Sequence, residues 1–178
     1  YVTVKGQFSP PEIAKNHRTI RPPQTMPDRL LETKFHAPLW RTDGVMRARL
    51  LSQLQAGLTE QRKLTLVSAP PGYGKTSLIT SWLHSFKKPM RSVWLSLEKS
   101  DNESARFLSY WAVAWSRVSD FEAETVLELL SEPQLPPFQN ILDEVINALA
   151  RLEEPAILIL DDYHIITNPL IHEILEIS

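Results

Sequence analysis

Apolar residues recur along the chain with two different periods, and segments of the two kinds alternate. Spacings of three and four residues, typical of amphipathic helices, cover 45–58, 78–86, 101–118, 121–131, 141–152 and 168–178. Short apolar runs, typical of buried strands, cover 64–68, 91–98 and 155–160. Strands that alternate with helices predict an α/β domain in which a parallel sheet is flanked by helices.

Residues 1–29 lack this patterning. Six of the fourteen prolines fall within residues 1–38, and residues 1–25 carry a small basic excess. We therefore expect 1–29 to be a disordered or weakly ordered, proline-rich lead-in to a domain that spans 30–178. Met26 is the first methionine and lies where the patterned sequence begins. This suggests the hypothesis that 1–25 are not native, which a mature N-terminus upstream of Met26 in mass spectrometry would contradict.

The composition narrows the classes of function. The 19 basic and 21 acidic side chains nearly balance, so the chain has no strong electrostatic footprint for nucleic acid or an anionic membrane. No apolar run approaches the ~20 residues of a membrane-spanning helix, and no signal-peptide pattern opens the sequence. Cysteine is absent, and the five histidines lack metal-ligand spacing. Together these features fit a cytoplasmic protein with no membrane partner.

The string SAPPGYGKTSL, residues 68–78, joins the first predicted strand to the helix that follows it. It places Gly72 and Gly74, two of only five glycines, directly before Lys75 and Thr76. A strand that turns sharply into a helix points several backbone N–H groups and the positive end of the helix dipole at one place. Because glycine has no side chain to obstruct that place, the string predicts a phosphate-binding loop.

The spacing matches the Walker A pattern G-x-x-x-x-G-K-[ST] over residues 69–76, except that Ala69 stands in the first place. Alanine there requires a backbone that avoids positive φ. In this pattern Lys75 reaches the β- and γ-phosphates, and the Thr76 hydroxyl binds Mg²⁺. We therefore predict a site for ATP with Mg²⁺. The predicted nucleotide-contacting residues of the loop are Ala69, Pro70, Pro71, Gly72, Tyr73, Gly74, Lys75, Thr76 and Ser77.

A second motif ends the last predicted strand. The string ILILDD, residues 157–162, places Asp161 where a Walker B carboxylate would bind Mg²⁺ directly or through water. Asp162 is the candidate catalytic residue, because it follows directly and would orient or polarise the attacking water. The alternative for both carboxylates is that they cap the following loop. For His164 the two interpretations are a γ-phosphate sensor and a structural loop residue.

With both motifs in place, the chain resembles the N-terminal ATPase region of the large ATP-binding LuxR-type transcriptional regulators. These regulators belong to the signal-transduction ATPases with numerous domains. The strings that carry the resemblance are LLETKFHAPLW, KLTLVSAPPGYGKTSLI, VWLSLEKSDNESARFLSYW and ILILDDYHIITNPLIHEIL. The match extends from about Leu30 to residue 178, and it departs from the family at Pro71, where alanine is common.

The resemblance implies a P-loop NTPase fold that acts as a switch, with ATP or ADP as its ligand and slow, resetting hydrolysis. It implies that the intact protein binds an inducer through helical repeats, self-associates, and contacts DNA only through a C-terminal helix-turn-helix absent from this sequence. The family's Val-x-Arg element is matched by Val45-Met46-Arg47. This match assigns Arg47 to the phosphate or adenine site, the alternative being a surface arginine on its helix.

The resemblance also implies missing parts. In this ATPase class a strand that follows the acidic one lies between the strands of Lys75 and Asp161, and a fifth strand flanks the Lys75 strand. The sequence ends soon after Asp161, so we expect a domain truncated after the Walker B strand, without arginine sensors or lid. The two strands are then expected to have unpaired edges, or to pair directly about 4.8 Å apart and misplace Asp161. Little or no ATP hydrolysis is expected from such a fragment.

Two other functions compete with a regulator. A free-standing P-loop enzyme such as a small-molecule kinase would need a lid with arginines, and residues 98–155 carry few basic side chains. A non-functional remnant of a broken regulator gene is the other alternative, which the downstream genomic sequence would distinguish.

Phe107, Trp111 and Trp115 lie at helical spacing, and we assign this aromatic stripe to the core.

Overall fold

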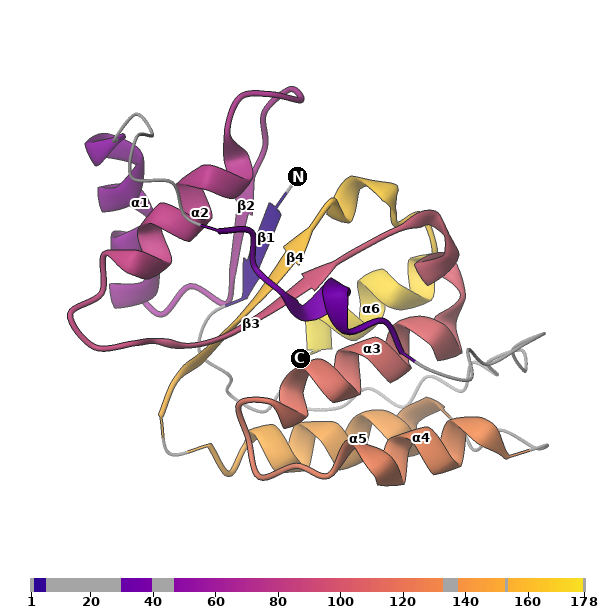
Figure 1. Cartoon of the computed structure of the whole chain (residues 1–178). Helices are drawn as coiled ribbons and strands as arrows, with labels where there is room; N and C mark the ends of the chain where they lie inside the picture. The colour runs from indigo at the N-terminus through magenta and orange to yellow at the C-terminus, as the bar shows by residue number, and fades with distance from the viewer. Residues whose placement is uncertain (1, 6–29, 40–46, 133–137, 153, 178) are drawn as a thin grey trace.

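The computed structural model describes residues 2–5, 30–39, 47–132, 138–152 and 154–177 (Figure 1). Its strands are β1 (Val2–Lys5), β2 (Leu64–Val67), β3 (Arg91–Ser96) and β4 (Ala156–Asp161). Its α-helices are α1 (Ala48–Thr59), α2 (Lys75–His84), α3 (Ser104–Ser116), α4 (Ala123–Ser131), α5 (Phe138–Leu149) and α6 (Pro169–Ile177). Three short 3-10 helices are η1 (Glu32–Phe35), η2 (Lys99–Asn102) and η3 (Tyr163–Ile165). Every helix and strand expected from the periodicity is present, with shifted ends, and the α/β class is confirmed.

The four strands form one mixed sheet in the order β2-β1-β4-β3. β3 pairs with β4 in parallel, whereas β1 pairs antiparallel with β4 on one side and with β2 on the other. β2 and β4 therefore run in the same direction and are separated by β1 (Figure 1). The sheet is thus not purely parallel, because one antiparallel strand lies within it.

The position of β1 overturns one expectation. Val2–Lys5, which fall within the predicted lead-in, form a strand inside the sheet; residues 6–29 lie outside the described residues. The strands that lead to Lys75 and end in Asp161 neither pair directly nor face each other with open edges, because β1 occupies the gap. The physical reason is twofold. Val-Thr-Val has high strand propensity, and an empty gap would leave buried backbone groups of β4 without hydrogen-bond partners.

Helices cover both faces of the sheet. α1 and α2 lie on one face, while α3 and α6 lie on the other, with α4 and α5 outside α3 (Figure 1). The buried residues of β4 alternate between the two sides, as the pleat of a strand requires. Ile157 and Ile159 belong to the cluster under α1 and α2, and Leu158 and Leu160 belong to the larger cluster under α3 and α6. β4 is therefore buried on both faces, and its carboxyl end is held firmly.

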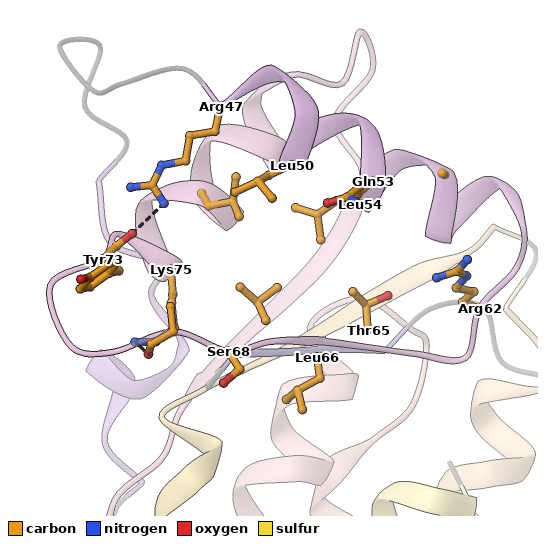
Figure 2. Close-up of a pocket in the computed structure, with 14 residues that line it drawn as sticks. Arg47, Leu50, Gln53, Leu54, Arg62, Thr65, Leu66, Ser68, Tyr73 and Lys75 are labelled. Atoms are coloured by element: carbon orange, nitrogen blue, oxygen red, sulfur yellow. Dashed lines mark hydrogen bonds between the residues drawn. The ribbon is translucent and has the colours of Figure 1, made fainter.

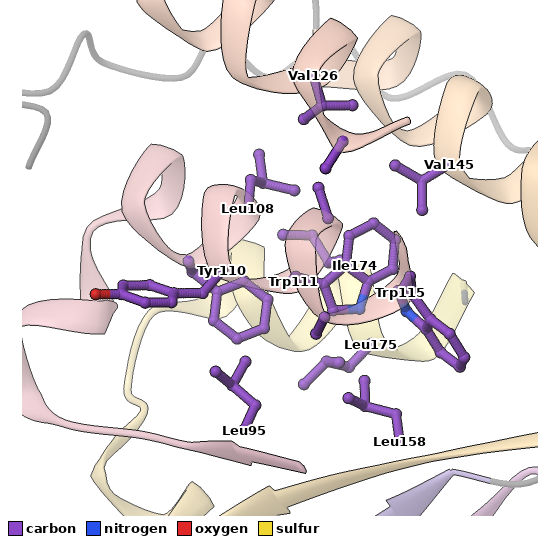
Figure 3. Packing of buried hydrophobic residues seen from close by; sticks show 14 of the residues in the cluster. Leu95, Leu108, Tyr110, Trp111, Trp115, Val126, Val145, Leu158, Ile174 and Leu175 are labelled. Atoms are coloured by element: carbon purple, nitrogen blue, oxygen red, sulfur yellow. The ribbon is translucent and has the colours of Figure 1, made fainter. Parts of the chain in front are cut away.

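The aromatic stripe of α3 lies in the larger core, as predicted. Phe107 and Trp111 are fully buried and Trp115 is 4% exposed. The two tryptophans pack among aliphatic side chains of the sheet, α5 and α6, including Leu158 and Ile174 (Figure 3). These residues therefore stabilise the fold and leave no aromatic platform exposed on α3.

A group of four charged side chains joins η1 to the carboxyl end of β3; we call it the Lys34 cluster (Lys34, Glu98, Asp101 and Arg106). Lys34 Nζ lies 2.5 Å from Asp101 Oδ2 and 3.2 Å from Glu98 Oε1. Arg106 contacts the same two carboxylates, with Nε 3.1 Å from Asp101 Oδ1 and Nη2 2.8 Å from Glu98 Oε1. The cluster fixes the segment before α1 to the sheet, and the sequence patterns did not indicate it.

Candidate functional site

The 69–76 loop leaves β2 and enters α2 through two glycines in the left-handed region of the backbone. Gly72 has a φ of 81° and Gly74 a φ of 71°, conformations that side-chain-bearing residues adopt only at a cost. Gly74 is the N-cap of α2, and no described side chain caps this end of the helix. The first amides of α2, beginning at Lys75, therefore have no intrahelical acceptor and lie at the positive end of the helix dipole.

The side chain of Lys75 folds back over the loop. Its Nζ donates to the carbonyl oxygens of Ala69 at 2.9 Å and Pro70 at 3.2 Å. Ala69 does not have a positive φ, so the Cβ at the first place of the motif causes no backbone strain. The ammonium group is thus held on the same side as the loop, where it can reach an anion bound to the helix amides.

The two predicted metal ligands meet. Thr76 Oγ1, in the first turn of α2, donates to Asp161 Oδ2, at the end of β4, over 3.2 Å. The other carboxylate oxygen of Asp161 accepts the Asp162 amide at 3.1 Å. Mg²⁺ is commonly bound by one or two protein oxygens together with waters and phosphate oxygens, and a hydroxyl beside a carboxylate fits that role. No group of three or more His, Cys, Asp or Glu side chains arranged for a metal occurs among the described residues.

Burial raises the pKa of Asp161 above its ordinary value. The neighbouring carboxylate of Asp162 raises this pKa further, while the hydrogen bond from Thr76 opposes the rise. The surroundings of Asp161 therefore disfavour its negative charge. A cation placed beside the carboxylate would favour that charge.

Asp162, the predicted catalytic residue, is placed differently from Asp161. It has a left-handed backbone with a φ of 59°, and its side chain is 56% exposed. Its Oδ1 lies 3.8 Å from Nδ1 of His164. Among the described residues, its carboxylate makes no hydrogen bond or ion pair with Lys75 or Thr76. The backbone turn after β4 therefore brings only one of the two aspartates to the loop.

Arg47, which directly precedes α1, lies over the loop. Its Nη1 donates to the carbonyl oxygen of Tyr73 at 2.7 Å, and its Nη2 would lie 3.4 Å from a Cβ added at Gly74. The guanidinium group is therefore in contact with the loop backbone, close to the N-terminus of α2. The first two residues of the matched Val-x-Arg element lie outside the described residues.

A cavity of about 470 Å³ lies between α1 and β2 and opens onto the loop (Figure 2). Leu50, Leu54 and Leu78 provide apolar lining, and Arg47 and Lys75 stand at the end nearest the loop. No acidic residue occurs among the described residues that line it. The cavity therefore suits a ligand with an apolar body and an anionic end, and its lining was not predicted as a site except at the loop and Arg47.

Asn102, at the end of η2, holds the segment that follows Asp162. Its Oδ1 accepts the amides of Thr167 at 2.7 Å and Asn168 at 3.1 Å, and its Nδ2 donates to the Ile165 carbonyl oxygen at 3.0 Å. Sequence reasoning missed this residue. The only local signal is an asparagine in the polar string SDNES, a few residues after β3, because asparagine pairs readily with nearby backbone groups.

No protein-family model matches the chain. None of the described helices has the length and apolar character that a membrane crossing requires.

Proposed function

We propose that this chain binds ATP with Mg²⁺ in a P-loop NTPase fold and serves as the nucleotide-dependent switch of a cytoplasmic LuxR-type transcriptional regulator. The observation that carries the nucleotide part is the 3.2 Å approach of Thr76 Oγ1 to Asp161 Oδ2. It brings the two ligands named by two separate motifs together beside the uncapped N-terminus of α2. If the loop motif matched only by chance, a residue of the second motif would not be expected to contact it.

In this proposal the amides at the start of α2 bind phosphate oxygens, because an anion satisfies donors that the helix itself leaves unpaired. Lys75 would exchange its two carbonyl acceptors for the β- and γ-phosphates. Thr76 and Asp161 would hold Mg²⁺, whose charge offsets that of the phosphates. Each residue is thus assigned a role that its present contacts allow without a large movement of the backbone.

The cavity beside the loop would take the nucleoside. Apolar contacts from Leu50 and Leu54 suit the faces of a base, and Gln53, which also lines the cavity, offers an amide for its edge. Arg47 lies between the cavity and the loop, so we assign it to the junction of sugar and phosphates. Because the described lining carries no carboxylate, a triphosphate meets no repulsion on this side.

We expect slow hydrolysis or none from this chain, for a reason other than the one expected from the sequence. Asp161 reaches Thr76, so a misplaced metal ligand does not account for low turnover. Asp162 is mostly exposed, its Oδ1 lies 3.8 Å from Nδ1 of His164, and among the described residues it makes no hydrogen bond or ion pair with Lys75 or Thr76. A water poised at the γ-phosphate would therefore lack a base, and the site would act as a binding switch.

The assignment to a regulator rests on the resemblance alone. DNA binding, inducer binding and self-association would belong to segments outside this sequence. An in-frame continuation of the gene into helical repeats and a helix-turn-helix would support the assignment. A stop codon directly downstream would instead favour a remnant of such a gene, and this result would leave the nucleotide site itself unaffected.

A thermal-unfolding series with and without Mg-ATP tests the binding. Nucleotide at 100 times its dissociation constant should stabilise the chain by about 2.7 kcal/mol, which corresponds to a rise in the unfolding midpoint of roughly 5–11 °C at this size. Lys75→Ala should abolish the rise. The matched control is Lys87→Ala, which removes an exposed lysine beyond the far end of α2 and should retain it. A rise that persists in Lys75→Ala, or no rise in the unaltered chain, would exclude this site.

A further inference from the structure

A second cavity, of about 430 Å³, lies away from the 69–76 loop. Arg91, the first residue of β3, belongs to its lining and pairs with Ala156, the first residue of β4. Asp161 is the last residue of β4, so this cavity lies at the opposite end of the sheet from the predicted metal ligands. The connection from α3 to α4, together with α5 and the residues that follow it, forms the other walls (Figure 1).

The lining of this cavity, which we call the mixed-charge cavity, combines both signs of charge with an apolar base. The guanidinium groups come from Arg91 and Arg151, the carboxylates from Asp120, Glu122 and Glu144, and the apolar side chains from Phe121 and Leu152. Phe121 is 8% exposed, and Leu152 packs against the larger core. Two cations and three anions leave the described lining with one net negative charge.

The opposite charges of the mixed-charge cavity do not neutralise one another. Among the described residues, no hydrogen-bond or ion-pair partner occurs for the side chains of Asp120, Glu122, Glu144 and Arg151. Arg91 differs, because its Nε lies 3.4 Å from Glu154 Oε2 and its Nη1 donates to the Val118 carbonyl oxygen at 3.3 Å. In the Lys34 cluster, by contrast, all four charged side chains pair with one another. The mixed-charge cavity therefore offers one arginine and three carboxylates whose bonding capacity is unused.

A ligand with charges of both signs would satisfy both kinds of group. A carboxylate accepts two parallel hydrogen bonds from one guanidinium group, and an ammonium or guanidinium group donates to carboxylates. The net negative charge of the lining favours a ligand with a net positive charge. The volume falls in the range of small-molecule sites, about 300–1,000 Å³. An amino acid with a cationic side chain combines these features, and its aliphatic part suits the apolar base formed by Phe121 and Leu152.

We propose that the mixed-charge cavity binds a free amino acid with a cationic side chain. Arg151 binds the carboxylate, because it is the guanidinium group of the described lining that has no partner. The two cationic groups of the ligand are bound by the carboxylates of Asp120, Glu122 and Glu144. The proposal does not depend on nucleotide binding, since this cavity shares no described lining residue with the cavity beside the loop.

Isothermal titration calorimetry of the full chain with L-arginine and with L-lysine, at low ionic strength, tests the binding. At least one of the two should bind at one site per chain, with a dissociation constant of about 1 mM or lower. Its decarboxylated counterpart, agmatine for arginine or cadaverine for lysine, should bind at least about tenfold more weakly, because Arg151 then has no acceptor. If neither amino acid binds, or if the decarboxylated amine binds as tightly, the proposal is wrong.

Substitutions in the lining distinguish this site from a weak attraction to exposed charges elsewhere on the chain. Arg151→Gln and Glu144→Gln should each weaken binding at least about tenfold, and both should fold, because the two side chains are exposed and unpaired. The matched controls Arg49→Gln on α1 and Glu128→Gln on α4 remove exposed charges outside the cavity and should leave the dissociation constant unchanged. Far-UV circular dichroism verifies the fold of all four variants. Equal losses in lining and control variants, or a lining variant that binds as tightly as the unaltered chain, would overturn the proposal.

Discussion

Replacing Asp101 with asparagine is expected to destabilise the protein by about 3–5 kcal/mol, whereas replacing Glu98 with glutamine is expected to cost at most about 1 kcal/mol. The two carboxylates form a matched pair, because both contact Lys34 and Arg106 at distances between 2.5 Å and 3.2 Å. The number of contacts would therefore predict the same loss of stability for both variants. The different burial of the two side chains predicts a larger loss for Asp101→Asn.

The difference in magnitude follows from exposure. The side chain of Asp101 is 1% exposed and that of Lys34 7%, whereas that of Glu98 is 48% exposed. Asn at position 101 preserves the volume and can still accept the Glu98 amide, now bound at 2.8 Å, but it leaves a buried ammonium group without its closest anion. Lys34 would then be paired only with the half-exposed Glu98, and loss of a buried partner is more costly than loss of a pair in water, where solvent replaces the partner.

Urea unfolding followed by tryptophan fluorescence measures both variants, and thermal unfolding provides a second readout. At roughly 2–4 °C per kcal/mol for a chain of this size, the midpoint should fall by about 6–20 °C for Asp101→Asn and by less than about 4 °C for Glu98→Gln. The double variant Lys34→Met/Asp101→Asn should lose less than Asp101→Asn alone, because the unpaired charge is removed with its partner. Equal losses for the two single variants would refute the role given to burial.

Three changes in or near the candidate site have equally definite outcomes. Asp161→Asn should raise the midpoint of thermal unfolding at pH 7 without Mg²⁺, because the pKa of Asp161 is higher in the folded chain; stability then falls as the pH rises from the unfolded pKa through the folded one. The gain should disappear in acid, where the carboxyl is protonated in both states, and a lowered midpoint at pH 7 would contradict the argument. Asn102→Ala should cost about 1–3 kcal/mol in urea unfolding, since the amides of Thr167 and Asn168 lose their acceptor; an unchanged midpoint would show that the loop is held by other contacts. Gly74→Ala should cost about 1–2 kcal/mol because of the φ of 71°, and a neutral effect in the same assay would mean that the loop relaxes to another conformation.

Most elements of this fold could be predicted from the sequence because their signal is local. The spacing of apolar residues on α1 to α6 identifies each helix without knowledge of its neighbours, and β2, β3 and β4 are apolar runs bounded by polar residues or breakers. β1 has no such signal, since four residues are too few for a periodic pattern. Its β-branched residues favour a strand, but its place in the sheet depends on pairing with β2 and β4, which are distant in sequence.

The candidate site shows the same division between local and distant information. Motif spacing identifies Thr76 and Asp161, and the structure brings their oxygens together. Asp162 follows Asp161 with a positive backbone φ. An aspartate that follows a strand gives no sign of that conformation in the sequence. The Lys34 cluster escapes prediction for the same reason, because each member is by composition an ordinary surface charge until the partners are known.

β1 belongs to neither motif, yet it lies between the two strands that lead to them. Val2 pairs with Val67 on one side and with Asp161 on the other. β1 therefore keeps β2, which leads to Thr76, two interstrand spacings away from β4, which ends in Asp161. If β2 and β4 paired directly, the two strands would be closer by one interstrand spacing, about 4.8 Å. That movement exceeds the 3.2 Å that now separates Thr76 Oγ1 from Asp161 Oδ2. If a cation binds between these oxygens, occupancy of the gap and occupancy of the metal site are linked, and each must favour the other by the same factor.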